Sequence, residues 1–394
     1  MRKILCLLLA ALLLTGCAPS AAVEESISAA TEQVTAPVTT NPPDPMELLL
    51  DGMSLKEKVG QLFIVGPEQL TGGGIVTDMT LELSRALETY PVGGILLFAA
   101  NILSPEQITR LNRELQEASA LPLFLAVDEE GGRVARLAKN PAFQLPSYKS
   151  AAAVGASGNP EDALEMGRTI GGYLKQFGFN LDFAPVADVN TNPNNPIIGN
   201  RAFSADPAVA AQMSAAFAAG LGEQGILATF KHFPGHGDTN QDSHTGLAVS
   251  YRTREELESC EWLPFREATG RDLVMTAHVA LPGLTGDMTP ATLSREIVTG
   301  ILREELGFAG LIITDAMNMG AIVESYGSAE AAIAALEAGC DILLVPHNLP
   351  EAFEAVIAAV EDGRLSEQWL DSTVRRILEF KAAQGLLCEF TQGD

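Results

Sequence analysis

Short apolar segments alternate with amphipathic segments along most of the chain. Eight of the apolar segments have the length and the residue content of strands. They are Gln61–Val65, Gly94–Phe98, Leu123–Val127, Asn180–Ala184, Ile226–Phe230, Leu273–Ala277, Leu311–Thr314 and Ile342–Val345. The segments between them have helical periodicity. We predict that one helix begins after Ser104, which Pro105 and Gln107 follow in a capping-box pattern, and another after Ser294.

Continuously apolar strands that alternate with helices are typical of a parallel sheet covered by helices. Eight such units predict an α/β fold: a closed (β/α)8 barrel of the TIM type that forms a single domain. The alternative is an open doubly wound sheet. That alternative is weakened because no GxGxxG follows the first strand, and the glycines at 72–74 do not lead directly from a strand into a helix.

The first segment of the chain is typical of an export signal. Arg2 and Lys3 precede the apolar run Ile4–Leu14, which is too short for an ordinary transmembrane helix. The sequence LTGC that ends at Cys17 resembles a bacterial lipobox, which implies cleavage before Cys17 and lipidation of its thiol. An ordinary signal peptide with a coincidental cysteine is the alternative. We predict a signal peptide over residues 1–17 and a protein anchored by lipid to the outer side of the cell membrane.

Composition sets further limits. Residues 18–45 are rich in Ala, Ser, Thr, Glu and Pro and predict a disordered tether. The formal net charge of −25 argues against nucleic acid as a partner, because phosphate recognition requires a basic face. Cys260, Cys340 and Cys388 are too few and too widely spaced for a disulfide framework, so we interpret them as buried small residues or an incidental pair.

Charged and polar residues stand at the carboxyl ends of the predicted strands. These residues are Asp128, Asp182, Lys231, His232, His278, Asp315 and His347. The active sites of barrels are built at this end of the strands. We therefore predict that these residues, which come from non-adjacent segments, converge on one active site.

The stretch KHFPGHGDTNQDSH at residues 231–244 holds three of the five histidines of the chain. Metal binding is one interpretation, but a proline and a glycine break the helical spacing between His232 and His236. A phosphate cradle on the glycines and a purely structural role are two further alternatives. Acid–base chemistry is the fourth.

Acid–base chemistry is the interpretation that we favour. Asp242 precedes His244 by two residues, so its carboxylate can fix the imidazole tautomer and stabilise the imidazolium. Asp315 is placed to act as a nucleophilic carboxylate, with a helix N-cap as its structural alternative. Glu129 and Glu130, beside Asp128, are the rival nucleophiles.

Motifs spread from Met46 to the C-terminus resemble glycoside hydrolase family 3, and within it the β-N-acetylhexosaminidase branch. They are GGILLF, VDEEGGRVARL, NLDFAPVADVN, IGNRAFS, KHFPGHGDTNQDSH and ITDAMNMGAI. The resemblance implies that residues 46–394 form the catalytic barrel. It also implies a histidine acid/base, because many relatives take a glutamate from a second domain and only two helical stretches follow the eighth strand here.

The resemblance implies a role for each matched residue. Asp315 matches the catalytic nucleophile, and His244 matches the acid/base, with Asp242 as its partner. The matched substrate-binding residues are Asp128, Arg136, Arg201, Lys231 and His232. The implied reaction is double displacement with retention of configuration, and it requires no metal or other cofactor.

The implied substrate is a carbohydrate with a terminal non-reducing N-acetylglucosamine. Export of the protein suggests peptidoglycan fragments as the substrate, with chitin oligosaccharides as the second choice. The acceptor is either water or phosphate. We expect a monomer that meets the membrane only through its lipid anchor. Two alternative functions stay open. One is a β-glucosidase or β-xylosidase of the same family, and the other is a lipid-anchored sugar-binding protein without catalysis. The joint presence of Asp242, His244 and Asp315 argues against the binding protein.

Overall fold

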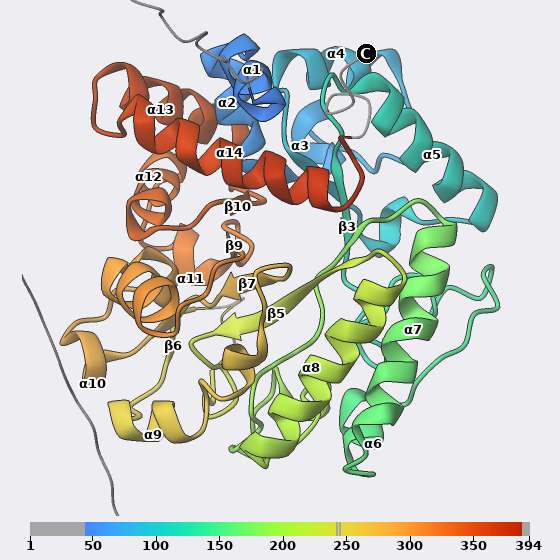
Figure 1. The fold of residues 1–394 in the computed structure, drawn as a ribbon, viewed down its shortest axis with the longest axis vertical. Helices are drawn as coiled ribbons and strands as arrows, with labels where there is room; N and C mark the ends of the chain where they lie inside the picture. The colour runs from blue at the N-terminus through green and yellow to red at the C-terminus, as the bar shows by residue number, and fades with distance from the viewer. Residues whose placement is uncertain (1–43, 242, 244–245, 388–394) are drawn as a thin grey trace, which may run out of the picture. The chain divides into compact units, whose positions relative to one another are not determined.

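The computed structural model describes residues 44–387 except for 242, 244 and 245 (Figure 1). The predicted signal peptide, the lipidation site Cys17 and residues 18–43 of the predicted tether lie outside the described residues, as do Asp242 and His244. The predicted end of the tether at residue 45 is wrong, because Asp44 caps a helix that begins at Pro45. Within the described part of the chain, no helix has the length and apolar character needed to cross a membrane.

All eight predicted strands are present, and they form one parallel sheet in the order β10-β1-β2-β3-β4-β5-β7-β9. Their bounds are β1 Phe63–Val65, β2 Gly94–Leu96, β3 Phe124–Val127, β4 Leu181–Asp182, β5 Leu227–Phe233, β7 Leu273–Thr276, β9 Leu311–Thr314 and β10 Leu343–Leu344. Ile313 of β9 pairs with Ile342, and the Thr314 N–H donates to the Ile342 carbonyl at 3.0 Å. The sheet therefore closes on itself. The (β/α)8 barrel is confirmed, and the open sheet is wrong.

Helical segments connect the parallel strands and lie around the barrel (Figure 1). The α-helices are α1 Pro45–Gly52, α2 Leu55–Gln61, α3 Pro67–Thr71, α4 Leu81–Thr89, α5 Pro105–Ala118, α6 Ala151–Gly155, α7 Pro160–Gln176, α8 Pro207–Glu223, α9 Arg254–Ser259, α10 Pro282–Thr285, α11 Gly320–Val323, α12 Ser328–Ala338, α13 Leu349–Glu361 and α14 Glu367–Ala383. The 3₁₀-helices are η1 Ala99–Asn101, η2 Gly199–Arg201, η3 Pro264–Glu267 and η4 Ala291–Leu293, and η5 Glu296–Glu305 is a π-helix.

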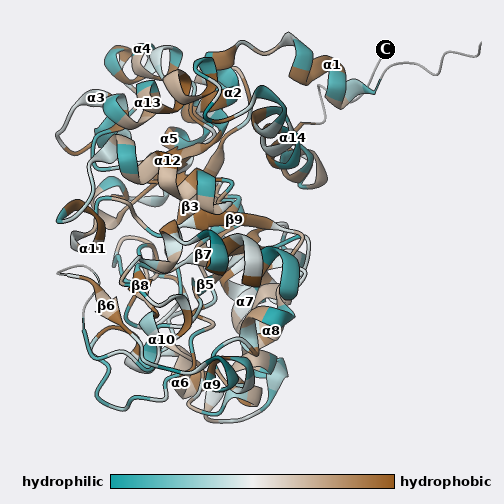
Figure 2. Cartoon of the chain, turned by 90° about the vertical axis from the view of Figure 1, so that its left-hand side faces the viewer, coloured by the Kyte–Doolittle hydropathy of each residue, from teal (hydrophilic) through white to brown (hydrophobic). Residues whose placement is uncertain are grey.

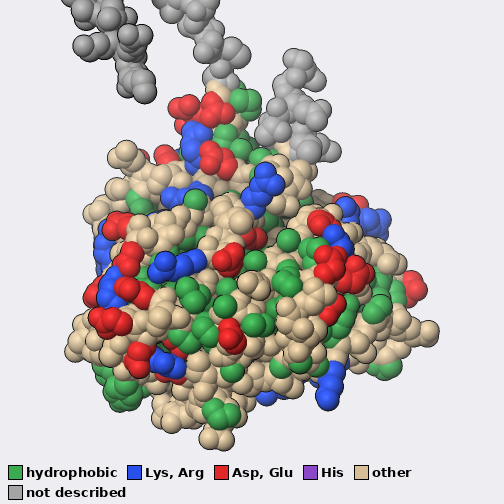
Figure 3. All heavy atoms as spheres, turned by 60° about the horizontal axis from the view of Figure 1, so that its bottom comes forward, with side chains coloured by type: hydrophobic (Ala, Val, Ile, Leu, Met, Phe, Trp, Pro, Cys, Tyr) green, Lys and Arg blue, Asp and Glu red, His purple; other side chains and the backbone are tan. Residues whose placement is uncertain are grey.

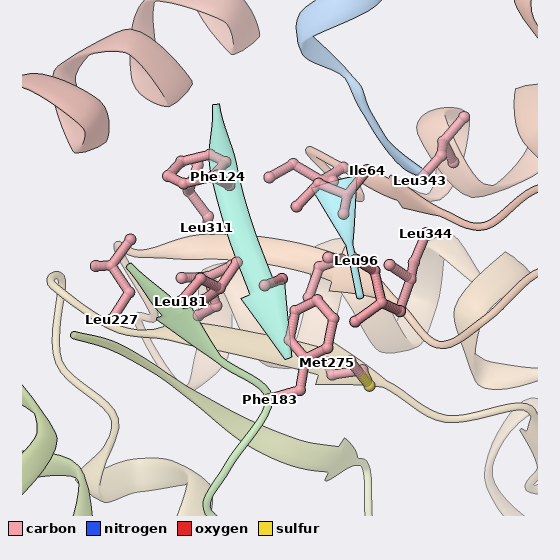
Figure 4. Close-up of a cluster of buried hydrophobic side chains, with 14 of the residues drawn as sticks. Ile64, Leu96, Phe124, Leu181, Phe183, Leu227, Met275, Leu311, Leu343 and Leu344 are labelled. Carbon is pink, nitrogen blue, oxygen red and sulfur yellow. The ribbon is translucent and has the colours of Figure 1, made fainter. Parts of the chain in front are cut away.

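Apolar side chains from the strands form the centre of the core. Figure 4 shows Ile64, Leu96, Phe124, Leu181 and Met275 within one cluster, and all five are buried. Burying each of these side chains contributes about 1.5–3 kcal/mol. In Figure 2, β3 and β9 have the brown of hydrophobic residues, whereas α9 and α14 carry hydrophilic teal. The continuous apolar strands of the sequence are thus explained by burial on both faces.

Helices α7 and α8 pack against each other through glycines. A Cβ atom at Gly167 of α7 would lie 2.2 Å from the carbonyl oxygen of Phe217, and one at Gly220 of α8 would lie 2.2 Å from that of Leu164. Neither position has room for a side chain. The small residues allow the two backbones to approach closely over the outer face of the barrel.

A buried lysine closes the amino-terminal end of the barrel, opposite the carboxyl ends of the strands. Lys381 of α14 donates from Nζ to Oε1 of Gln61 at 2.7 Å and to the carbonyl of Gly93 at 2.9 Å. The same ammonium lies 4.9 Å from the centre of the Phe124 ring. Burial lowers the pKa of Lys381 to about 7.

The local structure differs from the sequence prediction at several points. Ser104 caps α5 as predicted, but Oε1 of Gln107 accepts from the N–H of Leu103 rather than of Ser104, so the capping box is incomplete. The helix after Ser294 is a π-helix. The strands β6 Ala248–Val249 and β8 Val279–Ala280 form a second, two-stranded sheet that the sequence did not predict.

Two of the three cysteines of the body are described, and both are free thiols. They are the half-buried Cys260 and the buried Cys340. The two thiols are therefore not paired with each other, and Cys388 lies outside the described residues. On the surface, acidic and basic side chains are interspersed, as the face in Figure 3 shows.

Candidate active site

A pocket of about 510 Å³ lies at the carboxyl ends of the barrel strands. It is lined by six of the predicted site residues: Asp128, Arg136, Arg201, Lys231, His232 and Asp315. Asp128 directly follows β3, Lys231 and His232 belong to β5, and Asp315 directly follows β9. Parallel strands far apart in the sequence thus bring the predicted nucleophile and the predicted sugar-binding residues into one cavity.

A network of opposite charges forms one wall of this pocket. Nζ of Lys231 lies 2.8 Å from Oδ1 of Asp128 and 2.8 Å from Oε1 of Glu130. Arg201 makes two hydrogen bonds to the carboxylate of Glu130, with distances of 2.9 Å from Nε to Oε2 and 2.7 Å from Nη2 to Oε1. Nη2 of Arg136 lies 3.4 Å from Oδ2 of Asp128. The Glu130 side chain is 2% exposed and that of Asp128 is 17% exposed, so Asp128 is the carboxylate that a ligand can reach.

The buried members of this network are held in their charged forms. Burial alone would raise the pKa of Glu130, but the charges of Arg201 and Lys231 hold it well below its usual value. Burial disfavours the charge of Lys231, but Asp128 and Glu130 raise the pKa of its ammonium above the usual value. The wall therefore presents fixed donors and acceptors, which suits the hydroxyl groups of a sugar.

Glu129, one of the rival nucleophiles, is occupied by structural hydrogen bonds. Its side chain is buried and accepts from the backbone N–H groups of Leu137 and Ala138 at 2.9 Å each and from the hydroxyl of Tyr173 at 2.9 Å. Oδ1 of Asp182 in turn accepts from the N–H of Glu129 at 2.9 Å. Glu129 therefore folds the loop after β3 rather than facing the pocket.

Asp315 lines the pocket as an ionised carboxylate. Its Oδ1 accepts from the N–H of Ala316 at 2.8 Å. Burial alone would raise the pKa of Asp315, but His232, His278 and this N–H together hold it below its usual value. The helix N-cap alternative is wrong, because the next helix begins only at Gly320. An ionised carboxylate facing a cavity is available as a nucleophile.

His232 is oriented by a carboxylate that sequence reasoning did not single out. Its Nδ1 lies 2.7 Å from Oδ2 of Asp188, and Oδ1 of Asp188 accepts from the N–H of His236 at 2.7 Å. Asp188 is fully buried; burial alone would raise its pKa, but the neighbouring His232 lowers it. An Nδ1–H donor to Asp188 leaves Nε2 of His232 for a ligand. The sequence feature that could have pointed to Asp188 is its position as the second aspartate of the NLDFAPVADVN motif.

The loop after β5 is fastened beside the pocket through His236 and Ser243. The ring of His236 lies with Nδ1 2.6 Å from Oγ1 of Thr239 and with Nε2 3.1 Å from Oγ of Ser243. The carbonyl of Ser243 accepts from the N–H of Ala321, in α11, at 3.2 Å. Ser243 lines the pocket. The predicted acid/base pair, at the positions on either side of Ser243 in the sequence, lies outside the described residues.

Three of the predicted strand-end residues do not line the pocket, which corrects the expectation that all of them converge there. Asp182 is buried beneath the loop after β3, and His347 is exposed. His278 is buried, with its ring nitrogens 3.0 Å from Oγ1 of Thr292 and 3.1 Å from the carbonyl of Ala316, so it supports the segment of the nucleophile. Successive residues of a strand point to opposite sides, so position near a strand end does not by itself place a side chain in the pocket.

The glycines of the histidine stretch have a packing reason. A Cβ atom at Gly237 would lie 1.7 Å from the carbonyl oxygen of Val189, and one at Gly235 would lie 2.6 Å from Cγ of Glu261. Close approach of the Val189 backbone and of the Glu261 side chain therefore accounts for them without a phosphate. Among the described residues, no three His, Cys, Asp or Glu side chains are grouped so as to hold a metal ion.

Comparisons with known proteins identify the family of the chain. Residues 54–380 match the model of the glycosyl hydrolase family 3 N-terminal domain. The chain is 37% identical to β-hexosaminidase A of Pseudoalteromonas piscicida over 78% of its own length and 56% of that protein's length. It is 35% identical to the β-hexosaminidase of Stenotrophomonas maltophilia (strain K279a), covering 81% of this chain and 94% of that protein.

A solved structure gives the same result for the fold. The family 3 β-N-acetylglucosaminidase of Paenibacillus sp. str. FPU-7 superposes with a TM-score of 0.79 at 39% identity, over 85% of this chain and 63% of that one. The chain thus spans about half of one relative's length and nearly all of another's. With its barrel, its ionised pocket carboxylate and these relatives, the chain belongs to glycosyl hydrolase family 3 and is a glycoside hydrolase of the β-hexosaminidase type.

Proposed function

We propose that this chain is a retaining exo-β-N-acetylglucosaminidase that removes a terminal non-reducing N-acetylglucosamine. The observation that carries the proposal is that Asp315, whose pKa is held below its usual value, lines the same pocket as the charged wall of Asp128 and Lys231. In a retaining glycosidase, a carboxylate attacks the anomeric carbon and forms a glycosyl-enzyme, which water then hydrolyses. Asp315 has the charge state that this attack requires.

His244 is the proposed acid/base, with Asp242 as its partner. The imidazolium donates a proton to the leaving oxygen while Asp315 attacks, and the neutral imidazole then takes a proton from the incoming water. An imidazole has its ordinary pKa near neutrality, so it can perform both steps without burial. The proposal is supported by sequence position, because His244 directly follows Ser243, which lines the pocket.

The remaining predicted residues are proposed to hold the terminal sugar. The carboxylate of Asp128 accepts hydrogen bonds from sugar hydroxyls, Lys231 and Arg136 provide donors, and Nε2 of His232 is left to bond a further hydroxyl. Arg201 acts mainly through its two bonds to Glu130, which fix Lys231. Because the network is already charged and oriented before the substrate arrives, little free energy is lost in ordering it.

A trapped intermediate tests the nucleophile. A 5-fluoro N-acetylglucosaminyl donor should leave a covalent adduct on Asp315, found by peptide mapping, and Asp315→Asn should remain unlabelled. An adduct on Glu129 or Glu130 would contradict the assignment. Turnover of p-nitrophenyl N-acetylglucosaminide, compared with that of the corresponding glucoside and xyloside, tests the preference for the acetamido sugar.

For the natural setting, we propose that the enzyme acts as a monomer outside the cell membrane, on peptidoglycan fragments and with water as the acceptor. A lipid on Cys17 and a tether over residues 18–43 would hold the barrel there. The support is the LTGC sequence that follows the apolar run. Cys17→Ser should release the protein from membranes or block its maturation, and unchanged fractionation would reject the anchor.

A further inference from the structure

Arg133 differs from the other cations of the pocket. The structure describes four lysine and arginine residues among the lining side chains, and three of them, Arg136, Arg201 and Lys231, pair with Asp128 or Glu130. Within the described residues, Arg133 has no carboxylate partner. Its guanidinium donates instead to the carbonyls of Pro196, at 3.4 Å from Nη1, and of Ile197. Carbonyl oxygens position the group but do not neutralise its charge.

The position of Arg133 indicates which part of a substrate it meets. Arg133 is exposed, whereas Lys231 and Glu130 are buried deeper in the same pocket. The carbonyl of Ile197, which lines the pocket, also accepts from Nη1 of Arg201 at 3.4 Å, so it ties Arg133 to the charged wall. An enzyme that removes a terminal sugar holds that sugar inside and leaves the next one at the mouth. Arg133 is therefore placed beside the second sugar.

We propose that Arg133 recognises a carboxylate on the sugar that follows the scissile bond, so that the enzyme prefers an acidic aglycone to a neutral one. The lactyl ether of N-acetylmuramic acid carries such a carboxylate, and the sugars of chitin do not. A guanidinium presents a planar pair of donors that matches a carboxylate, and an uncompensated cation stands out in a chain with a net charge of −25. The inference rests on the proposed function and names the substrate class within it.

A matched pair of substrates separates this role from others. The acid is N-acetylglucosamine linked β-1,4 to N-acetylmuramic acid, and the neutral partner is the same disaccharide with the lactyl carboxylate converted to its methylamide. Wild-type kcat/KM should be about tenfold higher for the acid, the value of one charge-assisted hydrogen bond. Arg133→Gln should bring the ratio of acid to amide close to one, and Arg133→Lys should retain part of it. Added salt should lower the wild-type ratio.

The control variant is Arg113→Gln, which removes the same charge from α5 at a side chain that is 60% exposed and outside the pocket lining. It should keep the wild-type ratio. If Arg133→Gln slows both disaccharides equally, Arg133 only holds the loop at Pro196 and Ile197, and the inference is overturned. A wild-type ratio near one overturns it as well. If the wild type cleaves neither disaccharide nor the p-nitrophenyl N-acetylglucosaminide, the proposed function itself falls.

Discussion

Hydrogen-bond partners determine what each acidic residue near the carboxyl ends of the strands can do. Glu129 receives three backbone N–H groups and a tyrosine hydroxyl and is sealed from solvent, so its carboxylate organises a loop. Glu130 is held between Lys231 and Arg201. Asp315 receives one backbone N–H and faces the cavity. Three carboxylates with the same intrinsic chemistry therefore have three different roles.

The acid/base assignment leads to a prediction that depends on the leaving group. General acid help matters most when the leaving oxygen is basic. His244→Ala should slow the cleavage of a disaccharide by about 10²–10⁴-fold. It should slow the glycosylation step with an activated aryl glycoside much less, because an acidic phenol leaves with little protonation. Steady-state and burst kinetics on both substrates measure the two effects.

Asp242→Asn is the companion variant. It should show the same dependence on the leaving group in weaker form, because it disturbs the imidazole tautomer without removing the imidazole. Equal slowing of the glycosylation step by His244→Ala across leaving groups would make that residue a binding or folding residue, and the assignment of the pair would fail.

The sequence predicted the residues of the pocket wall better than it predicted their supports. Six predicted residues line the cavity, whereas Asp188 was not singled out and Glu130 was considered only as a rival nucleophile. Both are buried carboxylates whose partners are distant in the sequence: Asp188 bonds to a residue 44 positions away and Glu130 to one 71 positions away. Motifs report local spacing. They do not report which buried charge neutralises which, because that depends on the closed barrel.

At the level of helices and strands, the apolar pattern predicted existence more reliably than extent. The fourth strand was expected over Asn180–Ala184 but spans only Leu181–Asp182. Asn180 uses its side-chain amide to bond the backbone at Leu123 and Leu125, and Pro185, soon after the strand, has no N–H to donate. A hydrophobic pattern reports burial, which continues past the point where strand pairing stops.

The contact between α7 and α8 provides a stability prediction with a control in the same helix. Gly167→Ala would place a Cβ atom 2.2 Å from a backbone carbonyl of α8, so the helices must separate. The free energy of unfolding should fall by about 1–3 kcal/mol. At Gly172 of α7 the nearest atom to an added Cβ is 4.0 Å away. Gly172→Ala should therefore raise the free energy of unfolding by about 0.5–1 kcal/mol, because alanine has the higher helix propensity.

Urea unfolding of the wild type and the two variants, followed by circular dichroism, measures these changes. Opposite signs for the two substitutions are the expected result. Destabilisation of similar size at both positions would mean that the cost comes from replacing any glycine in α7, and the account of close helix contact would then be wrong.

For the molecule as a whole, Lys381 links stability to pH. Its pKa falls from 10.5 to about 7 on folding. A neutral amine has two N–H donors, which match its two oxygen partners. Below pH 7 the group is charged in both states, so its contribution is unfavourable and constant. Between pH 7 and 10.5 the unfolded chain binds a proton that the folded chain does not, so the free energy of unfolding rises with pH, by at most about 1.4 kcal/mol per unit.

The difference between wild type and Lys381→Met isolates this contribution from the other groups that titrate in the same range. The measurement is chemical unfolding of both proteins at pH values from about 6 to about 10, in steps of about one unit. This range covers most of the window between the two pKa values. The stability of the wild type should rise relative to that of the variant as the pH increases. Parallel curves would show that the amine keeps its proton in the folded protein.

The first and last segments of the barrel depend on each other. β1 pairs with β10, and Asp44 forms an ion pair with Arg375 at 3.0 Å. Gln61 accepts a hydrogen bond from Lys381, which lies 320 positions further along the chain. During synthesis, β1 must therefore wait for almost the entire polypeptide before its outer edge is covered. A chain interrupted before β10 holds two uncovered strand edges, on β1 and β9, and such edges can pair with another copy. The barrel therefore closes late in the synthesis of each chain. Truncated products will aggregate rather than persist as stable fragments.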